Sequence, residues 1–125
     1  TDPPGEQVYR GELSVNGRLW PGDMVNSDDG RLHLIYQLDG NLVLYFGAGT
    51  SNWEALWASG TDGTSPGFVV MQGDGNLVIY NRNGSPVWDS STFTAGSWLA
   101  VQNDGNVVIY SSSDEPQWST DTFVD

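Results

Sequence analysis

The sequence has no cysteine, one histidine and only four basic residues. Without cysteine the chain forms no disulfide and offers no thiolate chemistry. The lone histidine, His33, has no partners arranged for a Ser-His-Asp triad or a histidine-rich metal site. Sixteen acidic residues give a net charge of -12, which argues against nucleic acid and anionic membranes as partners because phosphate is repelled.

Long apolar runs are also missing, and none approaches the ~20 residues that span a bilayer, so we expect no membrane insertion. Apolar residues nowhere recur with helical spacing over ten residues. What the chain does have is 16 glycines and six tryptophans in 125 residues, which is typical of an all-β protein with many turns. The length predicts one domain covering residues 1–125.

The main feature is a threefold internal repeat at residues 37–45, 72–80 and 102–110. Five alternate positions are identical in every copy. These fifteen signature residues are Gln37, Asp39, Asn41, Val43, Tyr45, Gln72, Asp74, Asn76, Val78, Tyr80, Gln102, Asp104, Asn106, Val108 and Tyr110. One copy would indicate only a turn, whereas three copies in register indicate a function.

Each copy is followed by a tryptophan (Trp57, Trp88 or Trp118) and then by alternating hydroxyl residues. The first copy has about four extra residues near Phe46–Trp53, which predicts a longer hairpin loop. Trp53, within that insertion, is a candidate for the rim of a binding site. We expect the three repeated tryptophans to pack in the core.

The Asp-Gly pair of each copy predicts a hairpin turn. A two-residue turn at Asp39-Gly40 would put Gln37 and Asn41 on opposite faces. A three-residue loop, Leu38–Gly40, with a left-handed glycine would place them opposite each other. We favour the second loop because it gathers the polar residues on one face.

Strand-like runs precede the copies at Leu32–Tyr36, Phe68–Met71 and Trp98–Val101. After the turn, alternation turns Leu42 and Leu44 toward the core and Val43 away from it. Three sheets of this kind, each unable to bury its apolar face alone, predict a β-prism closed around one axis. We expect Val8–Leu19 to supply a first strand that completes the ring.

The polar face has a composition that suits a sugar. It carries Gln, Asp, Asn and Tyr, whose hydrogen-bonding groups have fixed geometry, and it lacks Lys and Glu. A valine that we expect to be exposed lies among them. A hexose offers the matching pattern of vicinal hydroxyls beside a small patch of C–H bonds, and a carboxylate strengthens the bonds to such hydroxyls.

With these motifs the chain resembles the monocot, or bulb-type, mannose-binding lectins, from about Tyr9 to Thr122. The resemblance implies a β-prism II fold of three four-stranded antiparallel sheets. It also implies three mannose sites that need neither metal nor cofactor. In each copy, Asp and Asn would bind the axial hydroxyl at carbon 2, Gln the hydroxyl at carbon 3 and Tyr the one at carbon 4, while Val would touch the ring carbons.

The same resemblance implies mannose-containing glycans or glycoproteins as partners and a secreted or extracellular location. Plant members usually carry a disulfide, which this chain lacks, so either a non-plant relative or a differently stabilised one is indicated. Plant members also exchange C-terminal strands to form dimers, and residues Gln117–Val124 could form such a homodimer.

Two other functions remain open. A glycoside hydrolase would need one pair of acids at a defined separation, and such a pair has no reason to be tripled. A protein-binding or toxin module on the same scaffold would have decayed sugar sites, whereas these motifs are complete. Two remaining motifs, Asn26–Gly30 and Asn83–Ser85, resemble a calcium loop and a glycosylation sequon, and we interpret both as turns.

Overall fold

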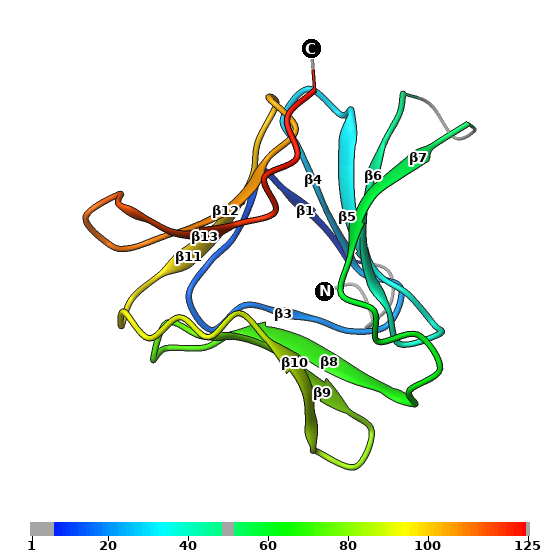
Figure 1. Cartoon of the computed structure of the whole chain (residues 1–125), viewed down its shortest axis with the longest axis vertical. Coiled ribbons are helices and arrows are strands. Elements are labelled where there is room, and N and C mark those ends of the chain that lie inside the picture. Colours follow the sequence, from blue (N-terminus) through cyan, green and yellow to red (C-terminus); the bar gives the residue numbers. More distant parts are fainter. Residues whose placement is uncertain (1–6, 49–51, 125) are drawn as a thin grey trace.

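The computed structural model describes residues 7–48 and 52–124, and these residues form three β-sheets arranged around one axis (Figure 1). In this part of the chain no helix is long and apolar enough to cross a membrane. The all-β class and the β-prism arrangement are therefore as predicted.

Each sheet contains one copy of the repeat as three consecutive antiparallel strands. The first contains β5 (Leu32–Tyr36), β6 (Leu42–Phe46) and β7 (Glu54–Ala58). The second contains β8 (Pro66–Met71), β9 (Leu77–Asn81) and β10 (Pro86–Asp89). The third contains β11 (Trp98–Val101), β12 (Val107–Tyr110) and β13 (Pro116–Ser119). The three runs predicted before the turns are thus confirmed as strands, with β8 beginning two residues earlier.

The N-terminal segment differs from the single strand expected over Val8–Leu19. It forms β1 (Val8–Arg10), β2 (Glu12–Leu13) and β3 (Arg18–Leu19), followed by β4 (Met24–Asn26). Strand β2 pairs with β11, β3 pairs with β8, and β4 pairs with β5. The segment therefore contributes to all three sheets. In the first sheet β1 adds a fifth strand, which runs parallel to β4.

The hairpin turns have the predicted three-residue form. In the first copy the amide of Gln37 donates to the carbonyl of Asn41 at 2.8 Å, and the amide of Gly40 donates to the carbonyl of Gln37 at 3.0 Å. The same two bonds occur in the other copies. The turn glycines have φ values of 90°, 95° and 96° at Gly40, Gly75 and Gly105, a region that favours glycine.

The core lies between the sheets, and each sheet sends its alternating aliphatic residues into it. Leu42, Leu44, Leu77, Ile79, Val107 and Ile109 are at most 1 % exposed. The N-terminal segment adds one fully buried residue for each sheet, namely Leu13, Leu19 and Val25. Tyr36 is also fully buried, and its hydroxyl accepts a bond from the amide of Gly67 at 3.0 Å, which ties the first sheet to the second. Burial raises the pKa of Tyr36.

The three repeated tryptophans meet one another. The ring centroids of Trp57, Trp88 and Trp118 are 5.6 to 5.7 Å apart, and every pair is edge-on, with interplanar angles of 73° to 77°. Edge-to-face contact is a favourable arrangement for aromatic rings. They pack against the core cluster as expected. Their mutual contacts hold together the last strands of the three sheets, β7, β10 and β13.

Replacing Gly75 with Ala is expected to destabilise the fold strongly. A Cβ atom there would lie 2.2 Å from the carbonyl oxygen of Thr94, and the φ of 95° is itself unfavourable for alanine. Strain and overpacking together should lower the free energy of unfolding by about 3 kcal/mol. Thermal unfolding followed by circular dichroism should show a midpoint lower by roughly 10 °C.

Gly84 provides the matched control, because it also has a positive φ, of 83°, but an added Cβ would meet no atom within 4 Å. Gly84→Ala should therefore cost only about 1 kcal/mol, from backbone strain alone. Equal losses in the two variants would show that the close approach of Thr94 is unimportant.

Candidate sugar-binding sites

The structure brings the five signature residues of each copy together on the outer face of its sheet. In the first copy Gln37 and Asn41 face each other across the turn, and Val43 and Tyr45 follow on the next strand of the hairpin. The valine was expected to be exposed, and this was wrong. Val43, Val78 and Val108 are only 3 to 5 % exposed, because residues of a neighbouring strand flank each of them on both sides. Each valine therefore forms the floor of its site.

Each signature asparagine has its side-chain oxygen fixed by the following loop. Asn41 Oδ1 accepts from Ser59 Oγ at 3.0 Å and from the amides of Gly60 and Thr61 at 3.0 and 3.2 Å. Asn76 and Asn106 make the equivalent bonds, to Ser90 and Thr92 and to Thr120 and Thr122. In a side-chain amide the oxygen accepts hydrogen bonds and the nitrogen only donates them. These donors therefore determine which way round the asparagine amide lies. In the first and third copies no described residue accepts from the donor nitrogen, Nδ2, whereas in the second copy Asn76 Nδ2 donates to Asp89 Oδ2 at 2.8 Å.

Sequence reasoning assigned no role to the alternating hydroxyls after each tryptophan, although their repetition was visible. In the first copy Thr61 Oγ1 donates to the carbonyl of Gly40 at 2.6 Å, and Ser59 Oγ accepts from the amide of Leu42 at 3.0 Å. The other copies repeat both bonds. These hydroxyls hold the turn and the asparagine in place, so they position the site.

The signature aspartates combine an anchored oxygen with an exposed carboxylate. Asp39 Oδ1 accepts from the backbone amide of Asn41 at 3.0 Å, and Asp74 and Asp104 make the same bond at 3.0 and 2.9 Å. The three side chains are otherwise exposed. The carboxylate can accept a hydrogen bond from a ligand hydroxyl, and a free amide N–H beside it can donate to the same hydroxyl.

The glutamine and tyrosine differ between the sites. In the second site Tyr80 donates to Gln72 Oε1, and Gln72 Nε2 donates to the carboxylate of Asp74 at 3.2 Å. The third site repeats this chain with Tyr110, Gln102 and Asp104. In the first site the amide is reversed, and Gln37 Nε2 donates to the Tyr45 hydroxyl.

An aromatic ring lies beside each tyrosine, on the neighbouring strand. His33, Phe68 and Trp98 are paired in register with Tyr45, Tyr80 and Tyr110. The ring centroids are 5.3 Å apart in both the second and the third sites. Sequence reasoning missed these residues, although each lies four positions before the signature glutamine.

The insertion lies next to the signature residues of the first copy through Trp53, which the sequence offered as one candidate for the rim. The Trp53 ring stacks on His33, with centroids 3.8 Å apart and an interplanar angle of 5°, and its centroid is 6.1 Å from that of Tyr45. His33 is held by Asn26 Oδ1 at 2.9 Å and by the carbonyl of Gly47 at 2.8 Å. The insertion does lie between the two strands of a hairpin, β6 and β7, although residues 49–51 are outside the described part.

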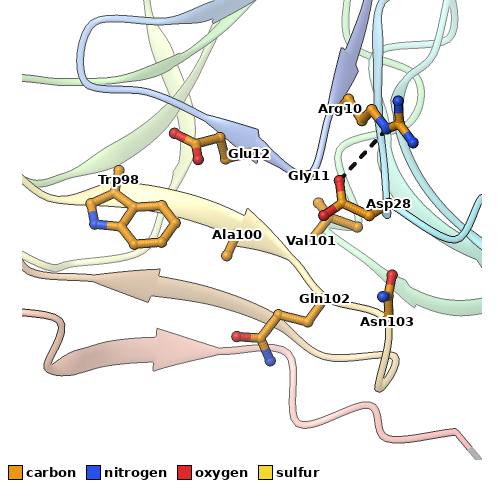
Figure 2. A pocket seen from close by; sticks show the side chains of 9 residues that line it. All are labelled: Arg10, Gly11, Glu12, Asp28, Trp98, Ala100, Val101, Gln102 and Asn103. Atoms are coloured by element: carbon orange, nitrogen blue, oxygen red, sulfur yellow. Dashed lines mark ion pairs between the residues drawn. The ribbon is translucent and has the colours of Figure 1, made fainter.

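The third site opens onto a hollow of about 340 Å³ (Figure 2). It shares Gln102 and Trp98 with the site and continues to Arg10, Glu12 and Asp28 at the N-terminal segment. Arg10 and Asp28 are exposed and form an ion pair at 3.8 Å. The third site therefore adjoins a space with polar and charged residues in its lining.

The segment Asn26–Gly30 forms a turn, as interpreted from the sequence. The amide of Gly30 donates to the carbonyl of Ser27 at 3.0 Å, and Gly30 has a φ of 79°. A hydrogen bond from Ser27, together with Arg31, lowers the pKa of Asp29. Across residues 7–48 and 52–124, no three acidic or histidine side chains are grouped so as to hold a metal ion. Asn83–Ser85 is likewise a turn, between β9 and β10.

Comparison with known proteins gives consistent relatives. No family model matches the chain. A lectin from the fungus Marasmius oreades is 34 % identical, with a TM-score of 0.82, and the match covers 93 % of this chain and 95 % of that one. The mannose-specific agglutinin of snowdrop (Galanthus nivalis), solved with methyl-α-D-mannoside, is 36 % identical with a TM-score of 0.71, covering 92 % and 99 %.

A sequence relative from a fish, the B-type lectin plumieribetin of Scorpaena plumieri, is 37 % identical over 60 residues. That match spans about half of each protein, 48 % in both cases. The solved structures, in contrast, match nearly end to end at more than 30 % identity, and they share the three-sheet arrangement described above. This chain belongs to the bulb-type, or monocot mannose-binding, lectin family.

Proposed function

We propose that this lectin binds terminal mannose through three sites of the same design, without metal. The observation that carries the proposal is that each copy places an aspartate carboxylate and an asparagine amide, held by its oxygen, next to a tyrosine and over a buried valine. Carboxylate and amide would meet the axial hydroxyl at carbon 2, as the resemblance implies. A site built to pair that hydroxyl disfavours glucose, which would leave buried polar groups unmatched.

Single sites this open should bind one sugar weakly, because few ligand atoms are buried and ordering has a cost. Three sites on one chain raise the effective concentration at surfaces with clustered mannose. The hollow beside the third site leaves space for the rest of a glycan chain. Dimer formation by exchange of residues 117–124 would double the valency, and it stays a prediction; here β13 pairs with β12 of the same chain. We also propose an extracellular location, where such glycans are displayed.

The test is binding of the protein to immobilised yeast mannan, measured by surface plasmon resonance. We expect binding that millimolar mannose competes away, that glucose competes for at least about tenfold less well, and that EDTA leaves unchanged. A calcium-dependent lectin run in parallel checks that the EDTA is effective. Loss of binding in EDTA would contradict metal independence, and equal competition by glucose would contradict the assigned selectivity.

The alternatives give different results in the same assay. A glycoside hydrolase would release reducing sugar from mannan over hours, and we expect no release because the acids recur with threefold symmetry instead of forming one catalytic pair. A protein-binding module with decayed sites would not be retained on mannan at all. The complete signature in all three copies favours the lectin.

A further inference from the structure

The three sites differ at the residue that faces the floor valine from the last strand of each sheet. Val43 pairs with Ala58, Val78 with Asp89, and Val108 with Ser119. Only the second site therefore has a second carboxylate, Asp89, opposite its valine. Asp89 is exposed at the surface of the sheet.

Asp89 accepts a hydrogen bond from the side-chain nitrogen of the signature asparagine, which in the other two sites is free to donate to a ligand. Asn76 Nδ2 donates to Asp89 Oδ2 at 2.8 Å. The amide of Asn76 is held by the bonds from Ser90 and Thr92 to its oxygen, so it cannot turn over without losing them. One of the two protons on Asn76 Nδ2 is therefore already donated to Asp89.

In the first and third sites the corresponding nitrogens are open. Among the described residues, no side chain or carbonyl accepts from Nδ2 of Asn41 or Asn106, and no buried polar atom lacks a partner. The two nitrogens must therefore reach water. A ligand hydroxyl at these sites meets one carboxylate and one free N–H donor.

The charge of the second site is correspondingly more negative. Asn76 bonds two carboxylates at once, with its backbone amide on Asp74 at 3.0 Å and its side chain on Asp89. Within residues 7–48 and 52–124, the ion pairs of the arginines go to Asp28 and Asp29, and none goes to Asp74 or Asp89. Both carboxylates therefore contact Asn76, and among the described residues no arginine forms an ion pair with either.

We propose that the second site prefers a sugar with an ammonium group in place of the carbon-2 hydroxyl, such as 2-amino-2-deoxymannose. This inference rests on the proposed function, which places the carbon-2 substituent between Asp and Asn. An ammonium group only donates, and it carries a charge that two carboxylates match. At the other sites the same group would face the free N–H of Asn41 or Asn106, which is also a donor.

The test is an NMR titration of the ¹⁵N-labelled protein with mannose and with 2-amino-2-deoxymannose at pH 6, where the amine is protonated. The backbone amides of Asn41, Asn76 and Asn106 report the sites separately. We expect the amino sugar to bind the second site roughly tenfold more tightly than the others, because charge-assisted bonds are about twice as strong as neutral ones. Mannose should show the opposite order.

A reciprocal exchange between equivalent positions provides the matched variants. Asp89→Ser should remove the preference of the second site for the amine, and Ser119→Asp should create one in the third site. Both residues lie on edge strands, where Asp89 is exposed and Ser119 is half-buried, so each variant should fold. Raising the salt to about 0.5 M should weaken amine binding and leave mannose binding unchanged.

The possible failures are distinguishable. If mannose binds but the amino sugar shows no preference for the second site, or if Asp89→Ser leaves that preference intact, the inference about Asp89 is wrong and the lectin proposal stands. If mannose perturbs none of the three asparagine amides, the proposed function itself is wrong.

Discussion

A variant carrying Asn at positions 39, 74 and 104 is expected to lose mannan binding by at least about 100-fold. Each Asp→Asn change replaces a carboxylate acceptor with a neutral amide, and a hydrogen bond to a charged group contributes about 1.5–3 kcal/mol. The loss is repeated at every site, so avidity falls with it. Surface plasmon resonance on immobilised mannan measures the change directly.

Asparagine is the appropriate replacement because the aspartates also hold the turns. Asp39 Oδ1 accepts from the backbone amide of Asn41, and an asparagine oxygen can accept the same bond. The fold should therefore persist, with a thermal midpoint within a few degrees of the parent. Alanine would remove both contributions together, and the result could not be attributed to binding.

The control removes three acidic charges elsewhere. Asp62, Glu115 and Asp121 are exposed and belong to no signature, so Asp62→Asn, Glu115→Gln and Asp121→Asn change the net charge by the same amount. This variant should bind mannan like the parent. Normal binding by the triple signature variant would show that the carboxylates do not contact the sugar.

Replacing Trp88 with Ala should cost about 3–5 kcal/mol in the free energy of unfolding. Its ring meets the edges of Trp57 and Trp118, at centroid distances of 5.6 and 5.7 Å, so its removal leaves both partners facing a cavity. Since domains are stable by only about 5–15 kcal/mol, this is a large fraction of the total. Urea denaturation followed by far-ultraviolet circular dichroism gives the value.

Two variants bracket this result. Trp88→Phe keeps an aromatic ring and should cost less than the alanine change. Phe93 lies in the connection that follows β10 but is 69 % exposed, so Phe93→Ala should change the free energy of unfolding by less than about 0.5 kcal/mol. A loss below 1 kcal/mol in Trp88→Ala would mean that the tryptophan cluster does not join the sheets.

The parts of the fold that repeat were predictable because their signals are local. Alternation separated Leu42 from Val43, and the chemistry of the polar face selected the three-residue turn, which Gly40 adopts with a φ of 90°. The same local rules placed all fifteen signature residues on outer faces. Because the pattern occurs in three copies, each inference about strands and turns was supported three times.

Features set by contacts between distant residues could not be predicted. Strands β2 and β3 have two residues each, too short to show a period, and their partners β11 and β8 lie far along the chain. The burial of Val43 depends on Ile35 and Ala58, its neighbours on either side. The residue after each tryptophan was visible as Ala, Asp or Ser, but its relation to the valine requires the strand register.

The N-terminal segment gives each sheet a strand that its own copy of the repeat does not encode, and with it one fully buried residue, Leu13, Leu19 or Val25. The unit that recurs in the sequence is thus not a unit that can fold by itself. An isolated copy would expose the apolar surface that Val8–Asn26 covers, so the three sheets should melt in a single cooperative transition instead of one after another.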